Sequence, residues 1–139
     1  MNIRVIDYSE GRFLISKDLN EETIKAAEVS IGISPVLKYR KGEDVVGALL
    51  NIDYSVNGSS ILFLGMVVSV YVENIKDILG GTVAKDIKKE LKPVWEIALG
   101  MARGVIAEKT RNTILKHHFL PIVDIDRFSD FSMLEEEKE

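Results

Sequence analysis

The sequence predicts an α+β fold, in which an antiparallel β-sheet of about four strands is followed by a long C-terminal helix and a short last helix. Apolar and mostly polar residues alternate along 29–39 and 45–56, which is the period of half-buried strands, and a third alternating strand, over 61–72, follows the turn after 45–56. After Glu73 the period becomes helical, and Pro93 stands where a first-turn proline opens a helix that we expect to reach about His117. A chain of 139 residues is near the commonest domain size, so we expect one domain over 1–139.

Composition and charge restrict the function classes. The chain is 46% hydrophobic and 29% charged, as in folded globular proteins, and its formal charge of -4 argues against a nucleic-acid partner. It has no Cys, which excludes disulfides and thiolate metal sites. The first ten residues lack the apolar stretch of a secretory signal, so we expect a cytoplasmic protein. The longest apolar run, 61–72, is shorter than the roughly 20 residues of a membrane helix, so we expect no membrane span.

The segments around these elements carry weaker signals. Residues 3–7 and 12–15 flank Ser9-Glu10-Gly11 and predict either an opening pair of strands or one strand with a bulge. Residues 16–27 read as a crossover with about one helical turn. Pro35 favours an edge strand or a bulge, and Asn57-Gly58 predicts a tight hairpin turn. Residues 76–79 read as the approach to a turn at Gly80-Gly81, and 82–91 as a helix.

The strand predicted at 61–72 is apolar on both sides. Phe63, Val67 and Tyr71 alternate with a second apolar series, and Leu49 shares their side in the preceding strand. A strand of this kind is either covered by more protein or forms an adhesive surface. We expect the chain to be too short to cover both faces of its own sheet.

Two glycines stand on the apolar stripe of the long helix, at Gly100 and Gly104. Each glycine costs a helix about 1 kcal/mol relative to alanine, so a pair usually serves close backbone approach. One interpretation is a tight fit against the chain's own sheet, and the other is helix contact across a homo-oligomer. The candidate residues for an oligomer interface are Trp95, Ala98, Gly100, Met101 and Gly104.

No catalytic constellation is visible. His117 and His118, followed by Asp124 and Asp126, are the only cluster that suggests metal or acid-base chemistry. Adjacent histidines on a helix point about 100° apart and do not readily share a ligand site, so we expect no metal and no cofactor. Phosphate-binding glycine loops and nucleophile elbows are missing from the sequence, so we predict that the protein is not an enzyme. Residues 129–139, which end in the charged run LEEEKE, are expected to form a disordered acidic tail.

Several strings, taken in order, resemble the SecB family of protein-export chaperones. They are VIDYSE, EVSIGISPVLKYRKGEDVVGALLNIDYSVNGSSILFLGMVV, GMARGVIAE and FLPIVDIDRF, which together span about Ile3 to Phe128. The resemblance implies a SecB-like cytosolic homo-oligomer, a dimer or tetramer, which holds unfolded polypeptide clients in apolar grooves without ATP. The expected client-binding residues are Leu37, Tyr39, Leu49, Phe63, Val67, Tyr71, Phe119, Leu120, Ile122 and Phe128.

Two departures from the family bear on protein transport. The chain has no Cys/His metal-binding tail, and Met66 stands where the family has an acidic residue that docks on the motor SecA. Asp7 matches another acidic docking position. Docking on SecA is therefore doubtful, and a dedicated client such as an antitoxin is an equal alternative. A structural or adaptor homo-oligomer of a phage or mobile element, binding one folded partner, is the second hypothesis, and an enzyme centred on His117 and His118 is the third.

Overall fold

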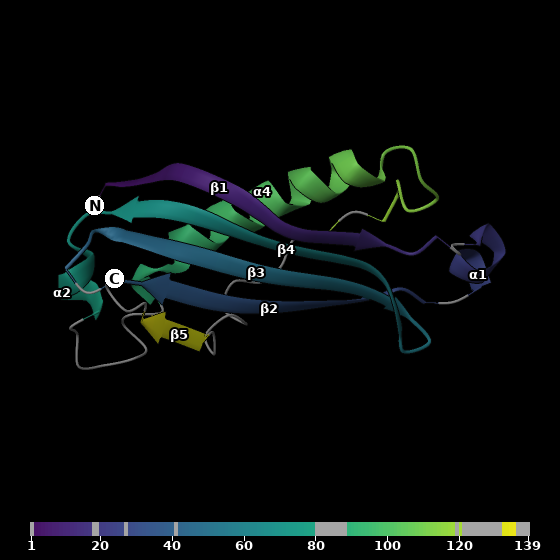
Figure 1. Cartoon of the computed structure of the whole chain (residues 1–139), viewed down its shortest axis with the longest axis horizontal. Coiled ribbons are helices and arrows are strands. Elements are labelled where there is room, and N and C mark those ends of the chain that lie inside the picture. The colour runs from purple at the N-terminus through teal and green to yellow at the C-terminus, as the bar shows by residue number, and fades with distance from the viewer. Residues whose placement is uncertain are drawn as a thin grey trace.

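The chain folds into one mixed β-sheet with a long helix against one of its faces (Figure 1). This computed structural model describes residues 2–17, 20–26, 28–40, 42–79, 89–118, 120 and 132–135. The elements are β1 (Ile3–Ile15), α1 (Glu21–Ala26), β2 (Ser30–Tyr39), β3 (Val45–Val56), β4 (Ser59–Val72), α2 (Ile75–Leu79), α4 (Lys92–Thr110) and β5 (Ser132–Glu135). The strand order is β1-β4-β3-β2-β5, and β1 to β4 pair antiparallel. The predicted α+β class is confirmed.

The three alternating segments form β2, β3 and β4. In β3 from Val46 and in β4 from Leu62, every second residue is buried, and α4 packs against both strands. Leu50 pairs with Met66 and Ile52 with Leu64, and these four side chains are fully buried. The hairpin between β3 and β4 turns at Asn57 and Gly58, whose φ values of 52° and 82° are those of the tight turn that this dipeptide favours. We call the side of the sheet beneath α4 the covered face and the opposite side the open face.

The opening segment is one strand and not a pair. β1 runs antiparallel to β4, with register shifts between Val5 and Asp7 and between Glu10 and Arg12. The bulge interpretation of the sequence is therefore the right one, with two bulges in place of one. β1 lies at one end of the strand order, so one side of its backbone pairs with β4 and the other is an edge.

Helix α4 is shorter than predicted. Proline in its first turn opens it as expected, but it ends at Thr110 and not near His117. Side chains compete with the helix at this point. The Thr113 hydroxyl donates to the Thr110 carbonyl over 2.8 Å and accepts from the Leu115 N–H over 3.1 Å, which favours turns over a continued helix.

Three shorter segments complete the comparison with the sequence. α1 supplies the expected helical turn, and the Asn20 side chain caps it by accepting the Glu22 N–H over 2.8 Å. Residues 76–79, predicted as the approach to a turn, belong instead to helix α2. Most of the predicted helix at 82–91 lies outside the described residues, and so does the segment 121–131, in the part of the chain where a short last helix was expected.

The acidic tail differs from the expectation of disorder. Residues 132–135 form β5, which pairs in parallel with β2 so that Val36 is opposite Ser132 and Tyr39 opposite Glu135. The remainder of 129–139 lies outside the described residues. The edge of β2 explains the difference, because its backbone groups can bind an extended segment of almost any sequence. Pro35, which cannot donate a hydrogen bond to such a neighbour, lies just before the paired stretch.

Candidate functional site

The open face carries an apolar row that crosses three strands. Val36 of β2 is opposite Leu49 of β3, and Leu49 is opposite Val67 of β4. Opposite residues in an antiparallel pair have Cβ atoms about 5 Å apart, so the three side chains form a continuous strip perpendicular to the strands. All three are half-buried, whereas their neighbours on the covered face, such as Ala48 and Val68, are fully buried. The strip therefore keeps apolar surface available for contact.

An aromatic ring lies on each side of the apolar row along β4, and an arginine of β1 covers each ring. The Arg12 guanidinium carbon is 6.0 Å from the centre of the Phe63 ring, and that of Arg4 is 4.8 Å from the centre of the Tyr71 ring. Both rings are half-buried. These distances are within the range of cation–π contacts. The open face thus combines apolar contact area with two oriented guanidinium groups.

Two glycines shape this surface. A Cβ added at Gly47 would lie 3.3 Å from Cγ1 of Val67, and one added at Gly65 would lie 3.4 Å from Cε1 of Phe63. The glycines therefore leave the space in which Val67 and Phe63 lie low against the sheet. Glycine inside a strand is the sequence signal for such a close approach.

Four of the predicted client-binding residues come together on the open face: Leu49, Phe63, Val67 and Tyr71. Val36 completes the row, but it was not predicted as a client-binding residue. Since neighbouring residues of a strand point to opposite faces, the burial of Leu37 on one face could have placed Val36 on the other.

Other predicted client-binding residues need correction. Leu37 is 0% exposed, because it pairs with Ala48 on the covered face, and Tyr39 is half-buried on that same face. Leu120 is 1% exposed and belongs to the core. A fully buried side chain cannot contact a client on the folded chain, which removes Leu37 and Leu120 from the site. Phe119, Ile122 and Phe128 lie outside the described residues.

The predicted interface residues on α4 differ in exposure, and Met101 is half-buried. Trp95 and Ala98 are 1% and 0% exposed and pack in the chain's own core, so they are not available to another subunit. Gly100 and Gly104 are exposed, and a Cβ added at either one would meet no atom within 4 Å. A tight fit of these glycines against the chain's own sheet is therefore the wrong interpretation. Contact with another subunit stays a prediction.

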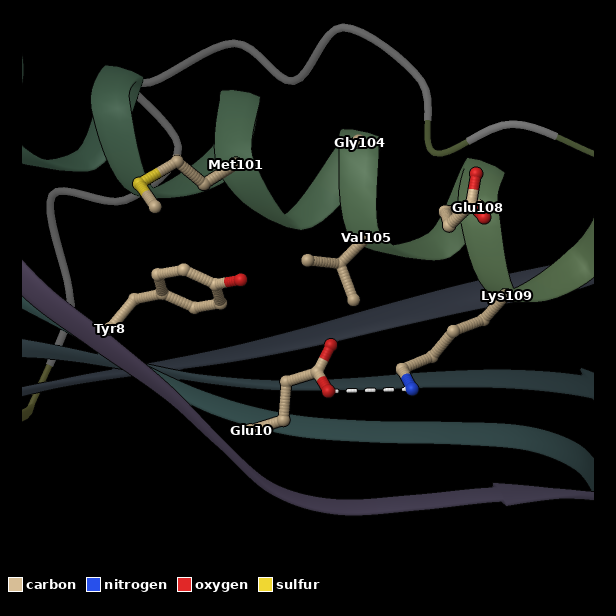
Figure 2. A pocket seen from close by; sticks show the side chains of 7 residues that line it. All are labelled: Tyr8, Glu10, Met101, Gly104, Val105, Glu108 and Lys109. Atoms are coloured by element: carbon tan, nitrogen blue, oxygen red, sulfur yellow. Dashed lines mark ion pairs between the residues drawn. The ribbon is translucent and has the colours of Figure 1, made fainter.

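A groove separates β1 from α4 (Figure 2). Its volume is about 400 Å³, and it is lined by Tyr8, Glu10, Met101, Gly104, Val105, Glu108 and Lys109. Tyr8 and Met101 approach it from opposite sides, and at one end Nζ of Lys109 lies 3.3 Å from Oε2 of Glu10. The same ammonium group lies 4.9 Å from the centre of the Phe13 ring. Sequence patterns did not predict the groove, because its two walls are separated by more than half the chain.

In the described part of the histidine cluster, the backbone of His118 makes a structural contact with the sheet. The hydroxyl of Tyr54, a fully buried residue, donates to the His118 carbonyl over 2.9 Å, and burial raises the pKa of Tyr54 to about 12. His117 is exposed. Among the described residues, no group of three or more His, Cys, Asp and Glu side chains is arranged to hold a metal. Asp124 and Asp126 fall outside those residues. Asp7, the predicted docking residue, is exposed on β1.

No protein-family model matches the chain, and a search of the curated proteins found no match. The resemblance to SecB therefore stays a prediction from the sequence. Over the described ranges, no helix has the length and apolar character needed to cross a membrane.

Proposed function

We propose that the protein is an ATP-independent holdase chaperone, which binds unfolded or extended polypeptide on the open face of its sheet. The observation that carries the proposal is the half-buried row of Val36, Leu49 and Val67 between two arginine-covered rings. The order of SecB-like strings along the chain supports it. A cytoplasmic homo-oligomer and a dedicated client such as an antitoxin belong to the same proposal, whereas docking on SecA has only Asp7 in its favour.

The shape of the open face favours a polypeptide over a small molecule. Small-molecule sites are concave and enclose most of their ligand, whereas this surface follows a sheet. An extended segment can lay alternate side chains on such a surface. Each large apolar side chain that it buries contributes about 1.5 to 3 kcal/mol. Arg4 and Arg12 add donors for client carbonyl groups beside the apolar row. Several weak contacts of this kind together bind an unfolded client with little preference for its sequence.

Aggregation of an unfolded test protein measures the proposed activity. The wild-type chain should suppress light scattering at a stoichiometric ratio without nucleotide. The double variant Leu49→Thr/Val67→Thr replaces apolar groups of the open face with hydroxyls, while threonine remains a residue that favours strands. It should suppress aggregation several-fold less than the wild type. Ser30→Thr, at an exposed position at the start of β2, is the matched control and should behave as the wild type.

Failure of the wild-type chain on several unrelated unfolded proteins would refute the general holdase. If the same double variant then lost binding to one folded protein, the adaptor hypothesis would replace it, because one surface would be serving a single specific partner.

A further inference from the structure

The open face carries more cationic than anionic side chains, although the chain as a whole is acidic. Directly opposite residues of antiparallel strands share a face, and the charged residues that pairing places on the open face are Arg4, Asp7, Arg12, Lys38 and Asp53. The formal charge of the chain is -4. Surface charges are screened beyond about 8 Å at physiological ionic strength, so these local groups, and not the net charge, determine the field that a bound segment meets.

The two carboxylates of the open face already accept hydrogen bonds within the chain. Oδ1 of Asp7 accepts the Tyr8 N–H over 2.8 Å, and Oδ1 of Asp53 accepts the Ser60 hydroxyl. The three cations differ from them, because no carboxylate in the described ranges forms an ion pair with any of the three. The hydrogen-bonding capacity that the charged groups of this face leave open is therefore mainly that of donors.

Aromatic rings hold the two guanidinium groups of the open face in place. Arg4 lies 4.8 Å from the centre of the Tyr71 ring, and Arg12 lies 6.0 Å from that of Phe63. A guanidinium group has five N–H donors and no acceptor, and contact with a ring leaves donors at its edge available. A side chain that is already held loses less conformational freedom when it binds a ligand. Both arginines are thus prepared for a carboxylate, whose two oxygens match the planar fork.

These observations identify a class of client, and we propose that the open face prefers extended segments in which acidic residues flank an apolar stretch. The apolar stretch lies on the row of Val36, Leu49 and Val67, and the flanking carboxylates bind Arg4 and Arg12. Lys38 lies opposite Gly47, one row of the sheet away from the apolar row, and adds a third positive charge. This inference rests on the proposed holdase function, because it names the preferred client of the same surface.

The register of the sheet gives the spacing of the acidic residues. Arg4 pairs with Tyr71 and Arg12 with Gly65, so the two arginines are separated by six residues of β4, which is roughly 20 Å in a strand. Val67 lies between these two levels of the sheet. An extended client that runs along the strands therefore meets both guanidinium groups when its carboxylates are about six residues apart, with apolar residues between them.

Three labelled peptides test the preference through fluorescence anisotropy. They share one apolar centre and differ only at two flanking positions about six residues apart, which are both Glu, both Gln or both Lys. The wild-type chain should bind the Glu peptide roughly tenfold more tightly than the Lys peptide at low salt, with the Gln peptide between them. The ratio of the two affinities should fall toward one as salt is added, because the contacts are exposed to solvent.

A double variant identifies the groups responsible. Arg4→Gln/Arg12→Gln should bring the ratio of the Glu to the Lys affinity close to one. Lys76→Gln/Lys116→Gln is the matched control, because it removes the same net charge at two exposed positions outside the sheet and should keep the ratio of the wild type. If the arginine variant does not fold, the order of the three peptides and its salt dependence on the wild-type chain still decide the proposal.

The outcomes separate this inference from the holdase proposal. Equal binding of all three peptides by a chain that suppresses aggregation would overturn the acidic preference alone. A chain that binds none of them and does not suppress aggregation would overturn both proposals. A Glu peptide with Ser in place of the apolar centre should bind at least several-fold more weakly than the apolar one. If it binds equally well, the face is a general anion site, and the inference is wrong.

Discussion

Leu37 and Leu49 are leucines of neighbouring strands that lie on opposite faces of the sheet. Leu37 is completely buried, whereas Leu49 is half-buried on the open face. We expect Leu37→Ala to lower the free energy of unfolding by about 2 to 5 kcal/mol, because it leaves a cavity in the core. Leu49→Ala should cost about 1 kcal/mol, because less surface is lost and no cavity forms. Urea unfolding of both variants measures the difference, and equal losses would contradict the assignment of the two faces.

Tyr54 links the core of the sheet to the chain after α4 through its hydrogen bond to the His118 carbonyl. Removing the hydroxyl in Tyr54→Phe leaves that carbonyl without its donor, so the variant should be about 1 kcal/mol less stable than the wild type at pH 7. Urea unfolding at neutral pH gives this value.

The same residue gives a pH prediction. The pKa of Tyr54 is raised from 10.0 to about 12 in the folded chain, so its contribution is complete below pH 10 and is lost as the pH rises through 12. At pH 11 the wild type should have lost about 1.4 kcal/mol of its stability at neutral pH, a loss that Tyr54→Phe does not undergo because phenylalanine has no ionisable hydroxyl. The gap between the two proteins should therefore close or reverse at pH 11, and a gap that is the same at both pH values would show that Tyr54 titrates normally.

At the scale of elements, the sequence pattern predicted correctly those strands and turns that are determined by interactions between residues near one another in the chain. The alternation in β2, β3 and β4 and the Asn57-Gly58 turn are set by neighbouring residues, and they were predicted correctly. The end of α4 was wrong by seven residues, because the Thr113 side chain stabilises a turn that apolar periodicity does not reveal. β5 was missed because a four-residue strand is fixed by the backbone of β2 and not by its own sequence.

Glycines in two elements should respond to the same substitution with opposite signs. Gly104→Ala in α4 places a Cβ in open space and should stabilise the isolated chain by about 0.5 to 1 kcal/mol, through helix propensity. Gly65→Ala in β4 places a Cβ 3.2 Å from Oδ1 of Asn51 and 3.4 Å from Phe63, so we expect a loss of about 1 kcal/mol. Thermal and urea unfolding of both variants, at one protein concentration, check the pair. A stabilising Gly65→Ala would show that Phe63 moves aside without cost.

At the scale of the whole molecule, the open face was predictable and the exposed apolar edge of β1 was not. β4 is apolar on both sides, and that excess is visible in one short segment of sequence. The edge of β1 becomes visible only through its register with β4, and the groove only through the packing of α4 beside Tyr8 and Glu10. The predicted interface at Trp95 and Ala98 was wrong, because both side chains pack in the chain's own core. This packing, like the groove, is visible only in the folded chain.

The proposed homo-oligomer and the open face of a single chain can be tested together by dilution. If the chain forms an oligomer, its melting temperature should rise with protein concentration by mass action. Because the row of Val36, Leu49 and Val67 lies within one chain, the dilute protein should still suppress aggregation of an unfolded protein, at a similar ratio per chain. Differential scanning calorimetry over a hundredfold range of concentration, with light scattering of the client, measures both. A protein that no longer holds clients once it is dilute and monomeric would mean that the binding surface is completed by two chains, and that one open face alone is insufficient.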